Sequence, residues 1–294
     1  MMQEGQIIKA LSGFYYVLSN GVTYQCKARG LFRKTKETPL VGDFVKFEAD
    51  NLTDGYVTEL LPRKNELVRP PVANIDQALI AVSAKEPEFS AKLLDRFLVL
   101  VEFNHIDAII LVTKMDLLDE NERPKLNQYI QDYQQLGYQV EQLSTEWPVQ
   151  HEVFTQLLED KTSVIAGQSG VGKSSFLNLL KPELKIETAE ISQSLGRGRH
   201  TTRHTELIHV YGGMIADTPG FSSLDFDQIE LEQLPFCFRD FESYREDCKF
   251  RGCMHVNEPN CAVKKAVEQH DISEYRYQHY LEFYHEIKSR KPRY

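Results

Sequence analysis

The sequence predicts a multidomain protein in which a small β-barrel precedes an α/β domain and a short cysteine-rich domain. The first 70 residues contain short β-rich segments separated by turn residues. Strand and helix patterns then alternate to about residue 220, and a cluster of metal-ligand residue types follows near residue 250. With 294 residues, the chain is long enough for two or three domains.

The first 70 residues have the composition of short antiparallel strands. Segments rich in aromatic and β-branched residues lie at positions 15–18, 22–26, 44–47 and 56–60. Asn20-Gly21 and Asp54-Gly55 are typical hairpin turns, because asparagine or aspartate before glycine accepts the required backbone angles. About 65 residues of this kind predict a five-stranded barrel, a fold that often binds nucleic acids. A purely structural barrel is the alternative.

The α/β region begins after Arg69-Pro70-Pro71, which predicts a stiff linker. Residues 76–84 are expected to form a strand, and Ser90 is placed to cap the helix that follows. That helix has apolar residues at helical spacing, which predicts that they pack on the core: Leu93, Leu94, Phe97, Leu98 and Val101. Alternation of strands and helices favours a parallel sheet flanked by helices.

Residues 167–174 read Gly-Gln-Ser-Gly-Val-Gly-Lys-Ser and match the phosphate-loop pattern G-x-x-x-x-G-K-[ST]. An apolar strand pattern at 162–166 precedes the run, and a helical pattern at 173–180 follows it, which is the context that this motif requires. Backbone amides and the helix N-terminus attract phosphate. Lys173 is expected to reach the β- and γ-phosphates and Ser174 to bind Mg²⁺. The predicted phosphate-binding residues are Gly167, Gln168, Ser169, Gly170, Val171, Gly172, Lys173, Ser174 and Ser175.

A second nucleotide motif lies upstream, where Thr113, Lys114, Met115 and Asp116 follow an apolar strand at 106–112. The Asp116 carboxylate can accept hydrogen bonds from N1 and N2 of guanine, whereas adenine offers no such pair of donors. Lys114 can lie over the base plane. The motif therefore predicts guanine selection, the alternative being an ordinary turn at the end of a strand. Ser144, with Thr145, is a candidate for a second guanine-contacting loop.

Downstream of the phosphate loop, Asp217-Thr218-Pro219-Gly220 follows the apolar strand 214–216. Asp217 is expected to interact with Mg²⁺, and the Gly220 amide is expected to contact the γ-phosphate. Because the guanine motif precedes the phosphate loop, which reverses the usual order in GTPases, the sequence predicts a circularly permuted GTPase domain.

Residues 196–204, which read Gly-Arg-Gly-Arg-His-Thr-Thr-Arg-His, occupy the place of the first switch loop. Thr201 or Thr202 is expected to bind Mg²⁺ and the γ-phosphate, and spacing does not choose between them. Phe221 follows Gly220 where many GTPases carry a glutamine that positions water. We therefore expect a histidine from the switch loop to assist hydrolysis, with His200 favoured over His204.

The cysteine-rich segment contains Cys248, Cys253, His255 and Cys261 within fourteen residues. Three thiolates and one imidazole match a closed tetrahedral zinc site, which is structural because no coordination position remains for water. A disulfide framework is disfavoured, since the cluster has an odd number of cysteines. The other two cysteines, Cys26 and Cys237, are expected to be small buried side chains.

These motifs together resemble the bacterial ribosome small-subunit-dependent GTPase A family. The resemblance spans essentially the whole chain and includes residues 113–116, 167–174 and 217–220 and the four zinc ligands. It implies an N-terminal OB-fold barrel (1–68) that binds RNA, a central circularly permuted P-loop GTPase α/β domain (69–226) and a C-terminal α-helical zinc-binding domain (227–294). It also implies Mg²⁺-dependent GTP hydrolysis stimulated by the small ribosomal subunit, a role in late maturation of that subunit, contact with rRNA, and one structural Zn²⁺.

Charge restricts how RNA could be bound. The net charge is −9, but residues 1–70 hold 10 Lys/Arg against 8 Asp/Glu, and the remainder holds 24 against 35. RNA contact is therefore expected only at basic patches, such as 29–36, 197–203 and 288–293, each of which could instead be a solvated loop. The aromatic residues at 275–284 are expected to dock a C-terminal helix on the protein rather than to stack on bases. The sequence shows neither a signal peptide nor a long apolar span, which favours a cytoplasmic protein without membrane contact, and we expect a monomer.

A different function also fits the sequence. Because Phe221 replaces the usual glutamine, the chain could be an RNA-binding module that senses guanine nucleotides without useful turnover. Measuring turnover with and without small ribosomal subunits distinguishes the two functions.

Overall fold

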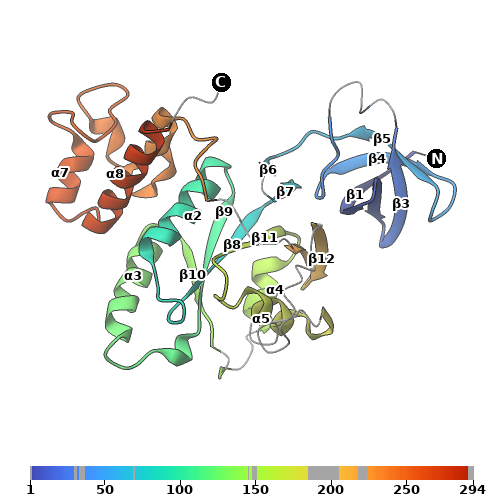
Figure 1. Ribbon diagram of the computed structural model, residues 1–294, viewed down its shortest axis with the longest axis horizontal. Helices are drawn as coiled ribbons and strands as arrows, with labels where there is room; N and C mark the ends of the chain where they lie inside the picture. The colour runs from blue at the N-terminus through green and yellow to red at the C-terminus, as the bar shows by residue number, and fades with distance from the viewer. Residues whose placement is uncertain are drawn as a thin grey trace. The chain divides into compact units, whose positions relative to one another are not determined.

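A computed structural model describes residues 2–29, 32, 37–68, 70–144, 146–147, 151–184, 205–217 and 224–290 (Figure 1). The strands are β1 (Met2–Leu11), β2 (Phe14–Ser19), β3 (Val22–Ala28), β4 (Phe44–Ala49), β5 (Gly55–Leu60), β6 (Glu66–Val68), β7 (Pro71–Ala73), β8 (Gln77–Ser83), β9 (Asp107–Thr113), β10 (Gln139–Gln142), β11 (Thr162–Ala166), β12 (Glu206–Val210) and β13 (Gly213–Asp217). The α-helices are α2 (Ala91–Phe103), α3 (Arg123–Gln135), α4 (His151–Leu158), α5 (Lys173–Leu180), α7 (Ala262–Glu268) and α8 (Glu274–Lys288). Short 3₁₀ helices are η1 (Met115–Leu117), η2 (Pro182–Leu184), η3 (Leu231–Cys237), η4 (Arg239–Phe241) and η5 (Arg245–Asp247).

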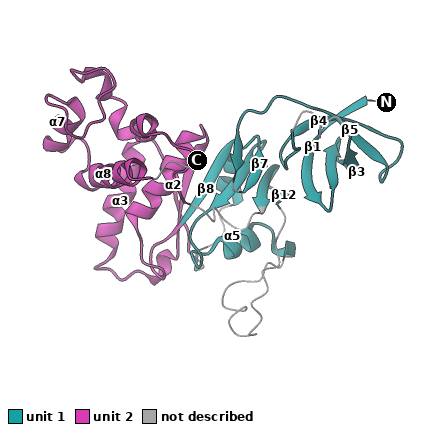
Figure 2. Cartoon of the chain, turned by 45° about the horizontal axis from the view of Figure 1, so that its top comes forward, with its two compact units in different colours: residues 1–81, 146–223 teal, residues 82–145, 224–294 magenta. Residues whose placement is uncertain are grey.

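The chain forms two compact units (Figure 2). The first unit contains residues 1–81 and 146–223, and the second contains residues 82–145 and 224–294. The α/β region is thus divided between the two units. The three predicted domain ranges stay a prediction. Among the described residues, no helix combines the length and the apolar character needed to cross a membrane.

A five-stranded barrel opens the first unit. The strands follow the order β1-β2-β3-β5-β4, and β1 pairs with β4 as well, which closes the sheet on itself. The β3–β5 pair is parallel, and the other pairs are antiparallel. Alternate residues point inward, so Ile7, Val17, Val45, Phe47 and Val57 are fully buried. The predicted barrel is confirmed.

The two predicted hairpin turns of the barrel differ. Asn20 and Gly21 both have positive φ, 49° and 77°, as a two-residue turn requires. The second hairpin is also present, between β4 and β5, but Gly55 is the first residue of β5 and pairs with Ala49, so the turn lies at residues 50–54 instead of at Asp54-Gly55. A Cβ atom at Gly55 would lie 2.5 Å from the Cys26 sulfur, so close packing against β3, not turn geometry, explains this glycine.

The linker after the barrel is a short hairpin, β6–β7, and it is bonded to the barrel. Val72 forms a bridge with Val41, and the Ala73 amide donates to the Val41 carbonyl at 2.9 Å. Arg63 donates through Nε to the fully buried Asp43 at 2.7 Å. These contacts attach the hairpin to the barrel, and the stiffness of the Arg69-Pro70-Pro71 linker stays a prediction, with Arg69 outside the described residues.

The remainder of the first unit is a mixed sheet with α4 and α5. Strand β11 is parallel to β8 on one side and to β13 on the other, and β12 pairs antiparallel with β13. Every residue of β8 and β11 is buried, which is typical of parallel strands covered on both faces. At its edge, β12 also pairs with barrel strand β1 through Lys9 and Glu206.

In the second unit, β9 and β10 are parallel neighbours, with α2 and α3 in the same unit. Ser90 caps α2 as predicted, since its hydroxyl accepts a hydrogen bond from the Leu93 amide at 3.2 Å. Leu94, Phe97, Leu98 and Val101 are buried, which confirms that these four belong to the core, whereas Leu93 is only partly buried.

The C-terminal segment of the second unit consists of 3₁₀ helices η3–η5 followed by α7 and α8. Its core includes Phe238, Phe241, Tyr280 and Phe283, all at most 1% exposed, and Val99 from α2 joins the same cluster. The aromatic residues of α8 therefore form a docking face, as expected from the sequence.

A buried ion cluster lies at the centre of the second unit. Arg276 of α8 is 1% exposed and lies between Asp95 of α2 and Asp240 of η4. Its Nε atom is 2.9 Å from both Asp240 carboxylate oxygens. Asp95, which is fully buried, also accepts hydrogen bonds from the Tyr133 hydroxyl at 2.7 Å and from His279 Nδ1 at 2.6 Å. Every carboxylate oxygen of Asp95 thus has a partner, which is the condition under which a buried charge is tolerated.

We predict that Arg276→Ala lowers the free energy of unfolding by about 3–5 kcal/mol, because it leaves two buried carboxylates without their cation. Lys92→Ala is the matched control. Lys92 pairs with Glu282 between the same two helices, but both side chains are about half exposed, so its loss should cost less than about 1 kcal/mol. Urea unfolding of both variants measures the difference. Equal midpoints for the two variants would contradict the prediction.

Candidate functional site

The phosphate loop connects β11 to α5 in the first unit, as the motif predicted. Gly167, Gly170 and Gly172 have φ values of 141°, 81° and 95°, which lie in the region that favours glycine. A Cβ atom on Gly167 would lie 2.3 Å from the Ala81 carbonyl oxygen of β8. The loop can therefore pass close to β8 and leave its backbone amides free of side-chain obstruction.

Lys173 begins α5 and folds back over the loop. Its ammonium group donates to the carbonyl oxygens of Gly167 at 2.7 Å and Gln168 at 2.8 Å. Burial lowers the pKa of Lys173. A partly desolvated cation that is held by neutral carbonyls is well suited to bind an anion, and a phosphate group here would favour the charged form.

Asp217 ends β13 next to the phosphate loop. Strands β11 and β13 are parallel, with Val164 opposite Ala216, so Asp217 comes at the same carboxyl edge of the sheet as Gly167. The carboxyl edge is where open parallel sheets bind ligands. Ser174, in the first turn of α5, and Asp217 are thus on elements that meet at this edge, as a shared Mg²⁺ would require.

The guanine motif lies in the second unit, at the carboxyl end of β9. Lys114 adopts a left-handed conformation, with φ 57° and ψ 38°. The Met115 amide donates to the Leu143 carbonyl at 3.1 Å, and the Leu143 amide donates to the Val112 carbonyl at 2.8 Å. Ser144, the candidate for the second guanine loop, directly follows Leu143 and is therefore beside residues 113–116.

The expected switch residues lie outside the described part of the chain. These are His200, Thr201, Thr202, His204, Gly220 and Phe221. Their roles stay predictions.

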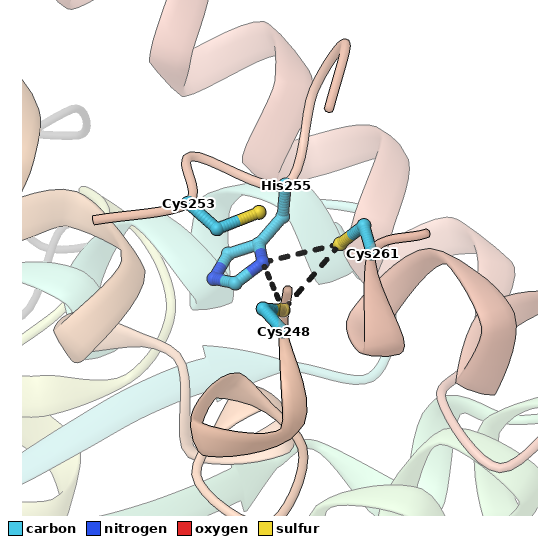
Figure 3. Close-up of side chains that lie close together, drawn as sticks. All are labelled: Cys248, Cys253, His255 and Cys261. Atoms are coloured by element: carbon cyan, nitrogen blue, oxygen red, sulfur yellow. Dashed lines mark hydrogen bonds between the residues drawn. The ribbon is translucent and has the colours of Figure 1, made fainter. Parts of the chain in front are cut away.

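The four predicted zinc ligands lie together in the second unit, and their ligand atoms are all within 4.8 Å of one another (Figure 3). His255 Nδ1 is 3.6 Å from the Cys248 sulfur and 3.3 Å from the Cys261 sulfur, and these two sulfurs are 3.8 Å apart. A tetrahedral Zn²⁺ with bonds of about 2.0–2.3 Å separates its ligand atoms by about 3.5–3.8 Å. The cluster therefore fits a closed zinc site.

The ligand loop is held by Glu258 within it and by Tyr277 of α8. The Glu258 carboxylate accepts hydrogen bonds from the amides of Met254 and Val256, both at 3.0 Å, and of Asn257 at 3.1 Å. The Tyr277 hydroxyl of α8 donates to the His255 carbonyl at 2.7 Å. These bonds fix the backbone on both sides of His255, which orients the imidazole toward the sulfurs.

Burial disfavours the charged forms of the ligand groups. Burial, together with the neighbouring cysteines, raises the pKa of the Cys253 thiol to about 12. Burial also raises the pKa of Cys261 and lowers that of His255. Without a metal, these three groups therefore remain neutral near pH 7. A divalent cation can stabilise the thiolates, and a neutral imidazole is the form that binds metal.

Comparison with known proteins assigns the family. Residues 60–227 match the RsgA GTPase family, and residues 4–57 match the RsgA N-terminal domain. The chain belongs to the RsgA GTPase family. It is therefore a circularly permuted GTPase, which agrees with the order of its motifs along the chain.

Relatives in the family match over their full length. The chain is 58% identical over 293 residues to the small ribosomal subunit biogenesis GTPase RsgA of Geobacillus sp. (strain WCH70), and 59% identical over 298 residues to that of Bacillus pumilus (strain SAFR-032), with 100% of both chains covered in each case. The crystal structure of YloQ, a circularly permuted GTPase, is 50% identical with a TM-score of 0.86, covering 100% of this chain and 98% of that one. The crystal structure of YjeQ from Thermotoga maritima is 36% identical with a TM-score of 0.88, covering 99% and 100%.

Sequence reasoning missed two groups of residues that support these sites. Lys85 and Glu86, which follow β8, contact the guanine motif or the segment after it. Glu258 organises the zinc-ligand loop. Neither group belongs to one of the sequence motifs that predicted the sites, so only their contacts revealed them.

We predict that Gly167→Ala weakens GDP binding at least about tenfold, because the new Cβ would displace the loop from β8 in addition to straining its backbone. Gly13→Ala is the control, since Gly13 also has positive φ (82°), but a Cβ atom there would meet nothing within 4 Å. Isothermal titration with GDP should show normal affinity for Gly13→Ala. Unchanged affinity for Gly167→Ala would contradict the prediction.

Proposed function

We propose that this chain is a GTPase that binds the small ribosomal subunit and acts in its late maturation, hydrolysing GTP to GDP and phosphate with stimulation by the subunit. The observation that carries the proposal is the full-length match to relatives named small ribosomal subunit biogenesis GTPase. The geometry of the phosphate loop supports catalytic competence. The proposed domains are residues 1–68, 69–226 and 227–294, acting as a monomer in the cytoplasm.

In this proposal the phosphates of GTP bind to the amides of residues 167–175 and to the Lys173 ammonium. Residues 113–116 read the base, with Asp116 accepting from guanine N1 and N2 and Ser144 adding a second contact. Lys173 leaves the carbonyl oxygens of Gly167 and Gln168 and donates to the phosphates instead.

Mg²⁺ would be held by Ser174, Asp217 and either Thr201 or Thr202. Bound there, Mg²⁺ neutralises negative charge on the β- and γ-phosphates. The Gly220 amide contacts the γ-phosphate. Because Phe221 cannot position water, His200 takes that role once the subunit positions residues 196–204, with His204 as the alternative.

In this proposal the barrel binds RNA, and the zinc ion has a structural role in the C-terminal segment. The barrel contacts rRNA mainly through shape, since a net charge of only +2 over residues 1–70 cannot support indiscriminate binding. One Zn²⁺, held by Cys248, Cys253, His255 and Cys261, stabilises the irregular loop between η5 and α7, which is otherwise maintained by few regular backbone hydrogen bonds.

We predict slow intrinsic GTP hydrolysis that small ribosomal subunits accelerate at least about tenfold, since a partner that completes a GTPase site can supply factors of ~10³ or more. Phosphate release is measured with small subunits and, as a control, with large subunits. Lys173→Ala should abolish turnover under both conditions, and His200→Ala should abolish mainly the stimulated rate. Equal rates with and without small subunits would refute the stimulation.

We predict one zinc ion per chain and its loss in Cys253→Ser, because three remaining ligands no longer close the tetrahedron. The variant should become more sensitive to protease near residues 248–261 while GDP affinity stays within about threefold of the wild type. Cys237→Ser is the control, since Cys237 lies outside the cluster and should leave zinc content at one. Metal analysis by mass spectrometry decides the outcome, and zinc-free wild-type protein would rule out the assignment.

A further inference from the structure

The loop that follows β8, residues 83–86, lies against the guanine motif in the second unit. The Ala84 amide donates to the Thr113 carbonyl at 2.9 Å, and the Thr113 hydroxyl donates to the Val82 carbonyl at 3.2 Å. The Lys114 ammonium donates to the Glu86 carbonyl. The end of β8 and the 83–86 loop therefore hold both of the first two residues of the motif.

The last of these contacts joins two strained residues. Glu86 and Lys114 have φ values of 58° and 57°, in the left-handed region that residues other than glycine rarely adopt. Such conformations persist only where the surroundings impose them, and they concentrate at functional sites. The position of the Glu86 carbonyl, and with it the direction of the Lys114 side chain, therefore depends on what holds the 83–86 loop.

Besides the Ala84 amide and the Ser83 hydroxyl, which bonds to the Lys85 carbonyl, the Lys85 side chain holds this loop. Its ammonium group lies 2.8 Å from a Glu122 carboxylate oxygen and 3.4 Å from an Asp119 oxygen. Glu122 also accepts a hydrogen bond from the Asp119 amide at 3.1 Å and precedes α3. Lys85 thus ties the loop that carries Glu86 to the segment that directly follows Asp116. The guanine motif therefore has the 83–86 loop on one side and, directly after it in the chain, the segment that Lys85 contacts.

We infer that Lys85 is a positioning residue for guanine recognition, acting through the Glu86 carbonyl on Lys114 and through the Asp119–Glu122 segment on Asp116. The inference rests on the proposed assignment of residues 113–116 to the base. If Lys85 formed only an ordinary surface ion pair, it would add a little to the stability of the fold. Its loss would then affect the binding of every ligand equally.

The test compares a ligand that uses the base with one that does not. Lys85→Ala should weaken GDP binding by about threefold to tenfold, while the affinity for inorganic pyrophosphate, which contacts only the phosphate loop, stays unchanged. Lys85→Arg should restore GDP affinity, since it keeps the cation between the two carboxylates. Lys92→Ala, which removes an exposed ion pair with Glu282 elsewhere in the same unit, should leave both affinities unchanged.

A double-mutant cycle separates positioning from general stability. In a Lys114→Ala background, Lys85→Ala should cause a smaller further loss of GDP affinity than it does alone, because the side chain that it positions is gone. Unchanged GDP affinity in Lys85→Ala, an equal loss for pyrophosphate, or full additivity with Lys114→Ala would each overturn the inference.

A separate measurement tests the proposed assignment of residues 113–116 to the base, so that its failure can be told apart from failure of the inference about Lys85. Wild-type protein should prefer GDP to XDP, and Asp116→Asn should reverse that preference, because the amide reads the xanthine edge. If the wild type shows no preference, the assignment of residues 113–116 is wrong, and the role of Lys85 falls with it. If Asp116→Asn reverses the preference and Lys85→Ala changes nothing, only the inference about Lys85 fails.

Discussion

The second unit depends on the ion cluster around Arg276. This guanidinium on α8 joins Asp95 of α2 and Asp240 of η4, and all three side chains are almost completely buried. The short C-terminal segment cannot bury much apolar surface by itself, so its core takes Val99 from α2 as well as its own aromatic residues. Buried charges are tolerated only when paired, and the pairing therefore fixes which helices can pack together. The zinc-ligand loop is hydrogen-bonded to α8 through Tyr277, so its position depends on how the ion cluster places α8.

Both ligand sites contain buried groups whose charged forms are disfavoured in the protein alone. The buried thiols of Cys253 and Cys261 have raised pKa values, and burial lowers the pKa of Lys173. Each group becomes more stable in its charged form when an ion of opposite sign arrives, zinc for the thiols and phosphate for the lysine. Ligand binding and the protonation of these groups are thus linked at both sites, in opposite charge senses.

Circular permutation changes the order of the motifs but leaves the geometry of each strand end intact. The phosphate loop follows β11, Asp217 ends the parallel neighbour β13, and the guanine motif follows β9. A parallel strand presents its following loop at the carboxyl edge wherever the chain happens to begin. The permuted domain is entered from the barrel through the β6–β7 hairpin into β8, and β12 additionally pairs with barrel strand β1.

The sequence by itself determined the features that depend on neighbours along the chain. Barrel strands, the Ser90 cap, the strand-loop-helix context of Gly167 and the spacing of the zinc ligands all follow from short-range periodicity and backbone preference. Only the tertiary structure decided which distant groups meet. Arg276 and Asp95 are 181 residues apart, Gly55 is required by the sulfur of Cys26 rather than by a turn, and Lys85 belongs to no motif. Pairing between such positions depends on how whole elements pack, and local composition carries no record of it.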